Sequence, residues 1–255
     1  MFPGKLEAPR LLYTLCLVIY RPHDMSYVVQ VISAGRSDRV QPMQQLLGTP
    51  TVWYVPHDQV DEYRSAGAEY VVAGGGLIES RNLALRLAHL EDMASVQVSD
   101  DLQVVKFYDG VNERREKSFR WALKYMFAGL RKTGCMLAGC APNDNKLNYK
   151  VPYQLKNFIV GDLIVVLPST PRFDTNMTLK EDYDFTCQHI AAYGGALRCA
   201  GLMPRFLHRE NPGGAVAYRT SEEEQKNIAY LHEKWPKAFV KHKKPDEIIM
   251  RWRYD

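Results

Sequence analysis

The sequence predicts an α/β protein with a mostly parallel central sheet, and three observations lead to this class. Short apolar runs alternate with amphipathic helical segments over about residues 27–98. Glycine, proline or a polar turn follows each run, as at the carboxyl end of a buried parallel strand. The chain has 255 residues, which is long enough to bury a core without disulfides. Sheets of this class bind ligands at the carboxyl ends of their strands.

The first half of the chain has the order β-α-β-α-β-α-β. Its strands are expected where β-branched and aromatic residues cluster, at Tyr27–Ser33, Thr51–Val55, Tyr70–Ala73 and Val96–Val98. Its helices are expected where apolar residues recur with helical spacing, at Val40–Leu47, Asp58–Ala66 and Ser80–Leu90. Three consecutive glycines, Gly74-Gly75-Gly76, separate the third strand from the third helix.

The second half is less regular. Its expected helices are Ser118–Arg131, Asp182–Ala192 and Ser221–Trp235, and its expected strands are Leu163–Leu167 and Leu197–Phe206. Glu224 follows Ser221 by three residues, which predicts a capping box with Ser221 as the N-cap. Because no linker is visible, we expect one domain over residues 25–236, with halves 25–105 and 106–236. Residues 1–24 are expected to be an N-terminal extension or leader, and 237–255 a basic C-terminal tail.

Composition excludes several classes of protein. With 46% hydrophobic and 24% charged residues, the chain is not disordered, collagen-like or a coiled coil. Its five cysteines are odd in number and contain no Cys-x-x-Cys pair, which favours a reducing compartment over a disulfide framework or a thiolate zinc site. The apolar run Leu11–Tyr20 is shorter than the about 20 residues that span a bilayer. We therefore expect a cytoplasmic location and no membrane partner.

Charge is unevenly distributed along the chain. Residues 57–101 contain nine acidic and three basic residues, whereas residues 106–156 contain eleven basic and four acidic residues. The basic stretch fits the phosphates of a nucleotide or a polynucleotide, and it also fits an ordinary solvated face.

Two adjacent carboxylates, Asp100 and Asp101, follow Ser99 directly after an apolar strand. A divalent cation such as Mg²⁺ or Mn²⁺ would relieve their repulsion and bridge a diphosphate, although a polar turn is the simpler interpretation. The glycine loop and Arg81 precede them, so helix amides and a guanidinium are available to phosphate oxygens.

Five motifs in this order resemble the nucleotide-sugar-dependent glycosyltransferases of the GT-A fold. They are SAGRSDRV (33–40), WYVP (53–56), GGGLIESRNLAL (74–85), VQVSDDL (96–102) and KEDYDF (180–185). The stretches EDYDFTCQHIAAYGGALR and ENPGGAVAYRT resemble, more narrowly, the TET/JBP-associated glycosyltransferases, which include the glucosyltransferase of base J synthesis and relatives in phages and large DNA viruses. The resemblance covers about Tyr27 to Trp235. It implies a single GT-A-like (Rossmann-like) domain, in which the first half binds the nucleotide sugar and the irregular second half binds the acceptor.

The resemblance also implies roles for donor-binding residues. Asp101 would be the ligand of Mn²⁺ or Mg²⁺, and Asp100 would aid ribose or metal binding. Ser99 stands where the usual motif has its first aspartate, so ribose contact is not expected there. Gly35 and Arg36 would lie against the nucleoside. Arg81 would approach the diphosphate or hold the acidic motif.

The carboxyl-terminal motifs supply the remaining roles. Asp182 is the expected catalytic base, with Glu181 and Asp184 behind it, because a carboxylate must take the proton of the attacking hydroxyl. The alternative is a structural role, because acidic residues in the first turn of a helix stabilise it through the helix dipole. By resemblance, His208 would be a further metal ligand and Arg219 would join phosphate binding.

The expected function is transfer of a sugar from a UDP-sugar to the hydroxyl of a 5-hydroxymethylpyrimidine in DNA. The basic residues expected on the DNA backbone are Arg114, Arg115, Lys117, Arg120, Lys124, Arg131 and Lys132. Tyr149, Tyr153 and Phe173 are candidates to stack on a flipped base. Two alternatives stay open: a protein or small-molecule acceptor, and a catalytically silent DNA-binding relative.

Overall fold

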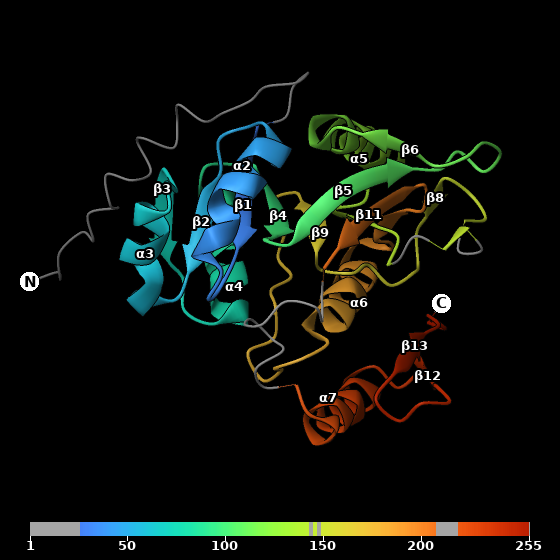
Figure 1. Ribbon diagram of the computed structural model, residues 1–255. Coiled ribbons are helices and arrows are strands. Elements are labelled where there is room, and N and C mark those ends of the chain that lie inside the picture. The colour runs from blue at the N-terminus through green and yellow to red at the C-terminus, as the bar shows by residue number, and fades with distance from the viewer. Residues whose placement is uncertain (1–25, 143–144, 147–148, 208–218, 255) are drawn as a thin grey trace, which may run out of the picture.

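The computed structural model describes residues 26–142, 145–146, 149–207 and 219–254, and helices cover both faces of its central sheet (Figure 1). The expected class, a mixed α/β protein with a large and mostly parallel sheet, is confirmed. The eight strands of this sheet are β1 (Tyr27–Ile32), β2 (Val52–Val55), β3 (Tyr70–Ala73), β4 (Ala94–Ser99), β7 (Leu137–Cys140), β8 (Tyr153–Gln154), β9 (Leu163–Val166) and β10 (Leu197–Cys199).

The strand order is β3-β2-β1-β4-β9-β7-β10-β8. Strands β3, β2, β1 and β4 run parallel, whereas β9 is antiparallel to both of its neighbours. Strand β1 has β2 on one side and β4 on the other, because the chain runs outward from β1 through β2 to β3 and then crosses back over the sheet to β4. A crevice for ligands is expected at the carboxyl ends of strands on either side of such a switch point.

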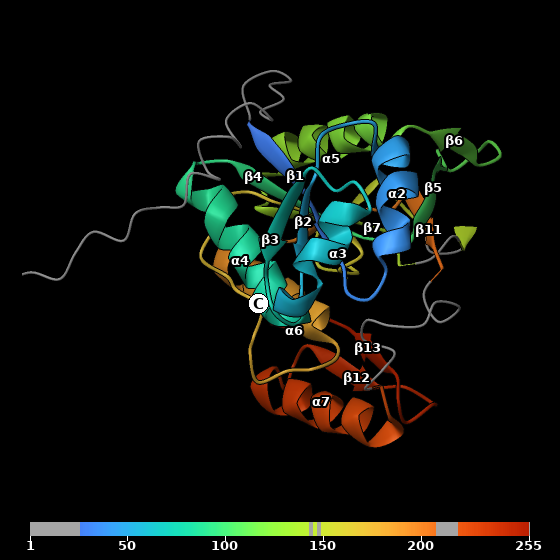
Figure 2. The same cartoon turned by 60° about the vertical axis from the view of Figure 1, so that its left-hand side comes forward.

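Two helical layers cover the sheet. One face carries α2 (Val40–Leu47), α3 (Val60–Ser65) and α5 (Phe119–Thr133). The other carries α4 (Leu77–Leu90) and α6 (Glu181–Tyr193), with α7 (Ser221–Lys234) beyond α6 (Figure 2). Within the described part of the chain, no helix combines the length and apolarity that a membrane crossing requires.

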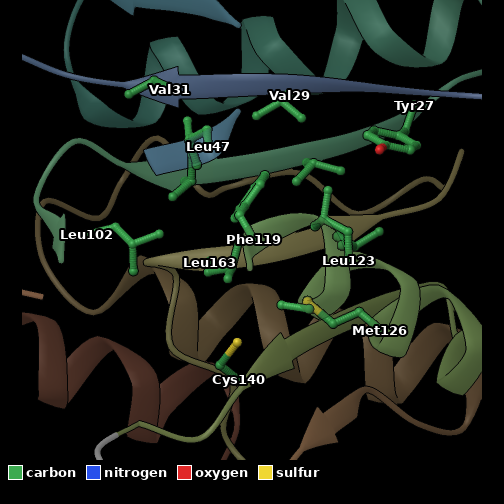
Figure 3. Packing of buried hydrophobic residues seen from close by; sticks show 14 of the residues in the cluster. Tyr27, Val29, Val31, Leu47, Leu102, Phe119, Leu123, Met126, Cys140 and Leu163 are labelled. Carbon is green, nitrogen blue, oxygen red and sulfur yellow. The ribbon is translucent and has the colours of Figure 1, made fainter. Parts of the chain in front are cut away.

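Alternation along β1 builds a separate core on each face. Val29 and Val31 face α2 and α5, where Figure 3 shows them in one cluster with Leu47 and Phe119. Val28 and Ile32 point the other way, into the cluster beneath α4. Because side chains of a strand alternate, a strand with helices on both faces is expected to be mainly apolar. Strand β1 is apolar except for Gln30, whose side-chain amide donates to the carbonyl oxygen of Ala84 at 2.8 Å.

A second, three-stranded sheet extends from the central one. Its strands are β5 (Leu102–Phe107), β6 (Arg115–Lys117) and β11 (Leu202–Phe206), in the order β11-β5-β6 (Figure 1). The expected single strand Leu197–Phe206 is therefore wrong. It divides into β10 and β11 at Gly201, where a Cβ atom would lie 2.5 Å from the carbonyl oxygen of Tyr108.

Two expected helix starts also differ. Helix α4 begins at Leu77 rather than Ser80, directly after the glycine loop. The N-cap of α7 is Thr220, whose hydroxyl accepts a hydrogen bond from the amide of Glu223 at 3.1 Å. Ser221 is not the cap, because its hydroxyl instead donates to Asp246 Oδ1 at 2.7 Å.

Residues 237–254, which we set apart as a tail, contain the hairpin of β12 (Phe239–Lys241) and β13 (Ile248–Met250). Phe239 and Ile248 are buried in the cluster that α6 and α7 share. The hydroxyl of Tyr183 in α6 donates to the carbonyl oxygen of Ile248 at 3.4 Å. The hairpin thus packs on the domain next to the start of α6.

Candidate active site

A cavity of about 590 Å³ opens at the carboxyl ends of β1 and β4, where the strand order places a ligand crevice. Such a volume is typical of small-molecule sites. Carboxylates outnumber cationic side chains eight to four among the described lining residues. The charged lining residues are Arg36, Arg81, Asp100, Asp101, Asp162, Lys180, Glu181, Asp182, Arg219, Glu224, Asp246 and Glu247.

Most of the residues singled out in the sequence therefore meet in one place. Arg36, Asp100 and Asp101 come from the first half of the chain, and Glu181 and Asp182 from the second. Arg81 and Arg219 line the same cavity. Gly35 precedes Arg36 with a φ of +69° and donates its amide to Gln59 Oε1 at 2.7 Å. His208 lies outside the described residues.

Asp100 is held by the protein itself. Its carboxylate accepts hydrogen bonds from the hydroxyl of Ser33 and from Arg36 Nη1, the latter at 2.6 Å. Burial raises the pKa of Asp100, and the Ser33 hydrogen bond and the Arg36 charge act in the opposite direction. The hydroxyl of Tyr63 contacts Ser33 Oγ at 2.5 Å and accepts from the amide of Arg36. This network fixes the loop after β1 against the loop after β4.

Asp101 is also buried, with 4% of its surface exposed, and it lines the cavity beside Asp162. No group of three or more His, Cys, Asp or Glu side chains suited to a metal ion occurs among the residues with described positions. Magnesium sites at phosphates typically use only one or two carboxylates and take their other ligands from the phosphates and water. A carboxylate that lines a cavity, as that of Asp101 does, is therefore a suitable protein ligand for such an ion.

The glycine loop shapes the cavity wall ahead of α4. Gly75 adopts a φ of +93°, which favours glycine, and Gly76 is the N-cap of the helix. At Gly74, a Cβ atom would lie 2.3 Å from Ser80 Oγ and 3.2 Å from the Ser80 Cα atom. Gly75, Gly76 and Leu77 line the cavity, so the amino end of a 14-residue helix faces it. Helix N-termini of this kind attract anions.

Arg81 is buried and joins parts of the framework. Its Nη1 atom donates to the carbonyl oxygen of Gly161 at 3.0 Å, and its Nε atom lies 3.6 Å from Glu181 Oε1. The guanidinium also lies over the ring of Phe173, 5.1 Å from its centroid. Arg81 thus neutralises Glu181 and links the start of α6 to the loop before β9. Gln97 in β4 is a further partner, because its Oε1 atom accepts a hydrogen bond from Arg81 Nη1 at 3.4 Å.

Asp182 has a strongly perturbed environment. Its Oδ2 atom accepts a hydrogen bond from the amide of Gly161 at 3.1 Å. Burial, together with the charges of Glu181 and Asp162, raises the pKa of Asp182 to about 7, while the Gly161 amide and Arg81 oppose this rise. A carboxyl group with such a pKa is partly ionised near neutral pH and can accept a proton there.

Two other candidate residues, Asp184 and Phe173, are buried and make packing or hydrogen-bond contacts within the protein. Asp184 is fully buried and is bonded to the indole of Trp235 at 2.7 Å and to Lys234 at 2.9 Å, so it faces α7 and not the cavity. Phe173 is 2% exposed and its ring stacks on Phe185, so the expectation that it stacks on a base is wrong.

Lys180, Glu224 and Asp246 also line the cavity, and no site role was predicted for them from the sequence. Lys180 precedes α6 with a φ of +60°, and its Nζ atom lies 2.6 Å from Glu224 Oε2. It also donates to the carbonyl oxygen of Asp246 at 2.9 Å. Glu224 lies within 3.3 Å of Arg219 as well. The two contacts of Lys180 join residues 44 and 66 positions apart in the chain, so no local pattern could reveal them.

Comparison with known proteins identifies no relative. The chain matches no protein-family model and no curated protein. Its function therefore has to be inferred from the chemistry of the site.

Proposed function

We propose that the protein is a metal-dependent glycosyltransferase of the GT-A type that moves a sugar from a nucleoside diphosphate, UDP in the first instance. One observation carries this proposal. Two acidic pairs that are 80 residues apart in the chain, Asp100-Asp101 and Glu181-Asp182, line one cavity at the switch point of the sheet. The first pair suits the donor's diphosphate with a cation, and the second suits the acceptor hydroxyl.

A divalent cation fits the charge of this cavity. A diphosphate alone would be repelled by the carboxylates that outnumber cations there. Asp101, which lines the cavity, would hold Mn²⁺ or Mg²⁺ together with the phosphate oxygens. When bound, the ion would neutralise charge on the departing diphosphate. Arg36 and the amino end of α4 would contribute further positive potential.

Asp182 would act as the general base. The acceptor hydroxyl transfers its proton to the Asp182 carboxylate while its oxygen bonds to the anomeric carbon. The bond from that carbon to the phosphate oxygen breaks, and the nucleoside diphosphate leaves with the electron pair. Arg81 keeps Glu181 neutralised beside the base, and Gly161 fixes the carboxylate through its amide.

We propose a 5-hydroxymethylpyrimidine in DNA as the acceptor. The segregated basic stretch of residues 106–156 supports a polyanionic acceptor. Five of its exposed cations lie on α5 and β6, which are placed side by side in both views (Figures 1 and 2): Arg115, Arg120, Lys124, Arg131 and Lys132. A protein or small metabolite is the alternative acceptor, and a DNA-binding protein without activity is the alternative from another class.

Mass spectrometry of hydroxymethylated DNA tests the proposal directly. The DNA is incubated with the protein, Mn²⁺ and a panel of nucleotide sugars, with unmodified DNA and protein acceptors in parallel. We expect one sugar mass to be added to hydroxymethylated DNA only, and transfer to fall at least about 100-fold in Asp101→Asn and Asp182→Asn. Asp61→Asn, which removes an exposed carboxylate on α3, is the matched control.

The other outcomes separate the alternatives. Label on protein or on small molecules alone would replace the DNA acceptor. DNA binding without measurable UDP binding in calorimetry, with or without Mn²⁺, would favour the inactive relative. Full transfer by Asp101→Asn would remove the metal assignment.

A further inference from the structure

Three lysines at one end of the molecule are each seated on an aromatic ring. Lys117 Nζ lies 5.0 Å from the centroid of the Trp121 ring, where β6 meets α5. Lys146 Nζ lies 5.1 Å from the ring of Tyr108, just after β5. Lys132 Nζ, near the end of α5, lies 6.0 Å from a third ring, that of Tyr153 in β8. Cations over ring faces are held by electrostatic attraction to the π-system.

The rings beneath the lysines pack against one another in two groups, which are together called the aromatic bed. Phe107 contacts Trp121 with centroids 4.9 Å apart, and Trp121 stacks on Tyr125 at 5.5 Å. Tyr125 contacts Tyr153 at 5.3 Å, and a separate pair at the hairpin is Tyr108 with Tyr149 at 5.2 Å. Because neighbouring rings and lysines cover them, these rings are poor platforms for stacking bases. Their role here is to hold the lysine chains in place.

Seating a lysine in this way reduces the entropy that it loses on binding a ligand. A free lysine side chain loses rotamer entropy when a ligand fixes it. The ammonium group retains N–H donors that can bind phosphate while it rests on a ring. Three such lysines on a rigid bed therefore form a surface preorganised for anionic groups.

The surroundings of the lysines are mainly positive. Exposed cations on the same elements and loops are Arg115, Arg120, Lys124, Arg131, Lys150 and Lys156. Of the nearby carboxylates, Asp109 accepts hydrogen bonds from the amides of Val111 and Asn112 in its own turn. Glu113 pairs with Lys146 at 2.9 Å, and Glu116 in β6 is exposed. The excess of cations favours a polyanion as the occupant.

The distance from the cavity follows from strand β5, which begins directly after Asp101. Lys117 lies opposite Val105, four residues along the strand, and Tyr108 is seven residues along. At about 3.3 Å per residue these positions are ~13 Å and ~23 Å from Asp101. Base pairs are spaced by about 3.4 Å, so the span corresponds to ~4 to ~7 base pairs.

We propose that Lys117, Lys132 and Lys146 bind the sugar–phosphate backbone of duplex DNA, with Lys117 and Lys146 about four to seven base pairs from the nucleotide that enters the cavity. The inference rests on the proposed DNA acceptor and adds the position and mode of DNA binding. Backbone contacts at this distance carry no sequence information. They fix the duplex while the acceptor base occupies the cavity.

Binding of an unmodified fluorescent 24-base-pair duplex tests this without any transfer reaction. In the variant Lys117→Gln/Lys132→Gln/Lys146→Gln, we expect affinity to fall at least about tenfold, and the slope of log K against log salt to flatten by roughly 2 to 3. The control variant Arg86→Gln/Lys226→Gln/Lys243→Gln loses the same charge at exposed sites elsewhere and should bind as wild type. Equal affinity and slope in the two variants would overturn the proposal. So would competition by polyglutamate that matches competition by duplex DNA at equal charge concentration.

A transfer assay then tests the distance. With the modified base ten base pairs from either end we expect a low KM, and with three base pairs on the anchoring side a KM raised at least about fivefold with kcat unchanged. The triple-lysine variant should lose this dependence on length. If duplex binding depends on the lysines but no sugar reaches DNA, the proposed function fails and the DNA surface stands. If transfer occurs and the lysines do not affect duplex affinity, the DNA surface proposed here fails and the proposed function stands.

Discussion

Asp100 and Asp182, one from each acidic pair of the cavity, differ in their hydrogen-bond partners and therefore in the role that each can have. Asp100 is bound by Ser33 and Arg36, which ties two loops together. Asp182 accepts hydrogen bonds from the backbone amides of Gly161 and Tyr183, and burial together with the charge of Glu181 raises its pKa. A carboxylate whose pKa is near neutrality is destabilised by its surroundings, so its free energy falls when it takes up a proton. Arg81 limits this destabilisation by pairing with Glu181.

The pH dependence of stability checks the state of Asp182 independently of activity. Its pKa is raised from 3.8 to about 7 in the folded protein, so between these values the folded state holds a proton that the unfolded state has lost. Stability should therefore fall as pH rises from about 4 to about 7, and should level off above. We expect Asp182→Asn, which removes this titration, to be more stable than wild type at pH 8 and similar to it at pH 4. Thermal melts of both proteins measure the difference.

Activity should have the opposite pH dependence if Asp182 is the base. The ionised carboxylate is the active form, so kcat/KM should rise through about pH 7 and then reach a plateau. A stability difference between Asp182→Asn and wild type that does not change with pH would contradict the raised pKa.

Among the elements, α4 begins at the cavity wall, after a close approach of the glycine loop to its first turn. The chain passes from β3 to α4 through Gly74, whose amide donates to the carbonyl oxygen of Val55 at 2.8 Å. There is no room for a Cβ atom between Gly74 and Ser80. This close approach sets where the amino end of α4 meets the cavity.

Gly74→Ala should displace the first turn of α4. We expect it to reduce the free energy of unfolding by about 1 to 3 kcal/mol, as overpacking usually does, and to weaken UDP binding. Ser80→Ala removes the nearest atom, so the double variant should recover much of the loss. Denaturant unfolding of the two single variants and the double variant completes the cycle. A double variant no more stable than Gly74→Ala would show that the backbone, rather than Ser80 Oγ, is the obstacle.

The sequence predicted the elements that depend on local pattern. Strands β1 to β4 and helices α2 to α6 lie close to their expected positions, because apolar periodicity and glycine breaks are local signals. The pairing of β5 with β11 and the antiparallel insertion of β9 were not foreseen, since nothing local encodes them. The same holds at the site. Acidic pairs could be read from the chain, whereas the partners of Arg81 and Lys180 depend on folding.

At the scale of the molecule, the carboxyl-terminal hairpin completes both the core and the cavity. Phe239 and Ile248 are buried against α6 and α7. Asp246 and Glu247, in the turn between the strands, line the cavity near Lys180. Losing the hairpin would thus expose apolar surface and open the cavity at once.

Phe239→Ala should destabilise the whole protein. Removing a buried phenylalanine ring costs about 3 kcal/mol or more, and the ring contacts Tyr183 at the start of α6 with centroids 5.9 Å apart. We expect one cooperative unfolding transition at a lower temperature. Ile249→Ala, on the exposed side of the same hairpin, should change little. Calorimetry of Phe239→Ala measures the number of transitions. A separate transition of the hairpin at lower temperature would show that the hairpin is not part of the cooperative unit.

Only Asp100 and Asp101 separate β4 from β5. Strand β4 belongs to the central sheet, and β5 pairs with β11 from much later in the chain. No cut between residues 105 and 106 would therefore yield two fragments that fold alone, since each would carry unpaired strand edges. An exchange of one half of the chain for that of another protein would therefore have to carry the partner strands of both halves with it.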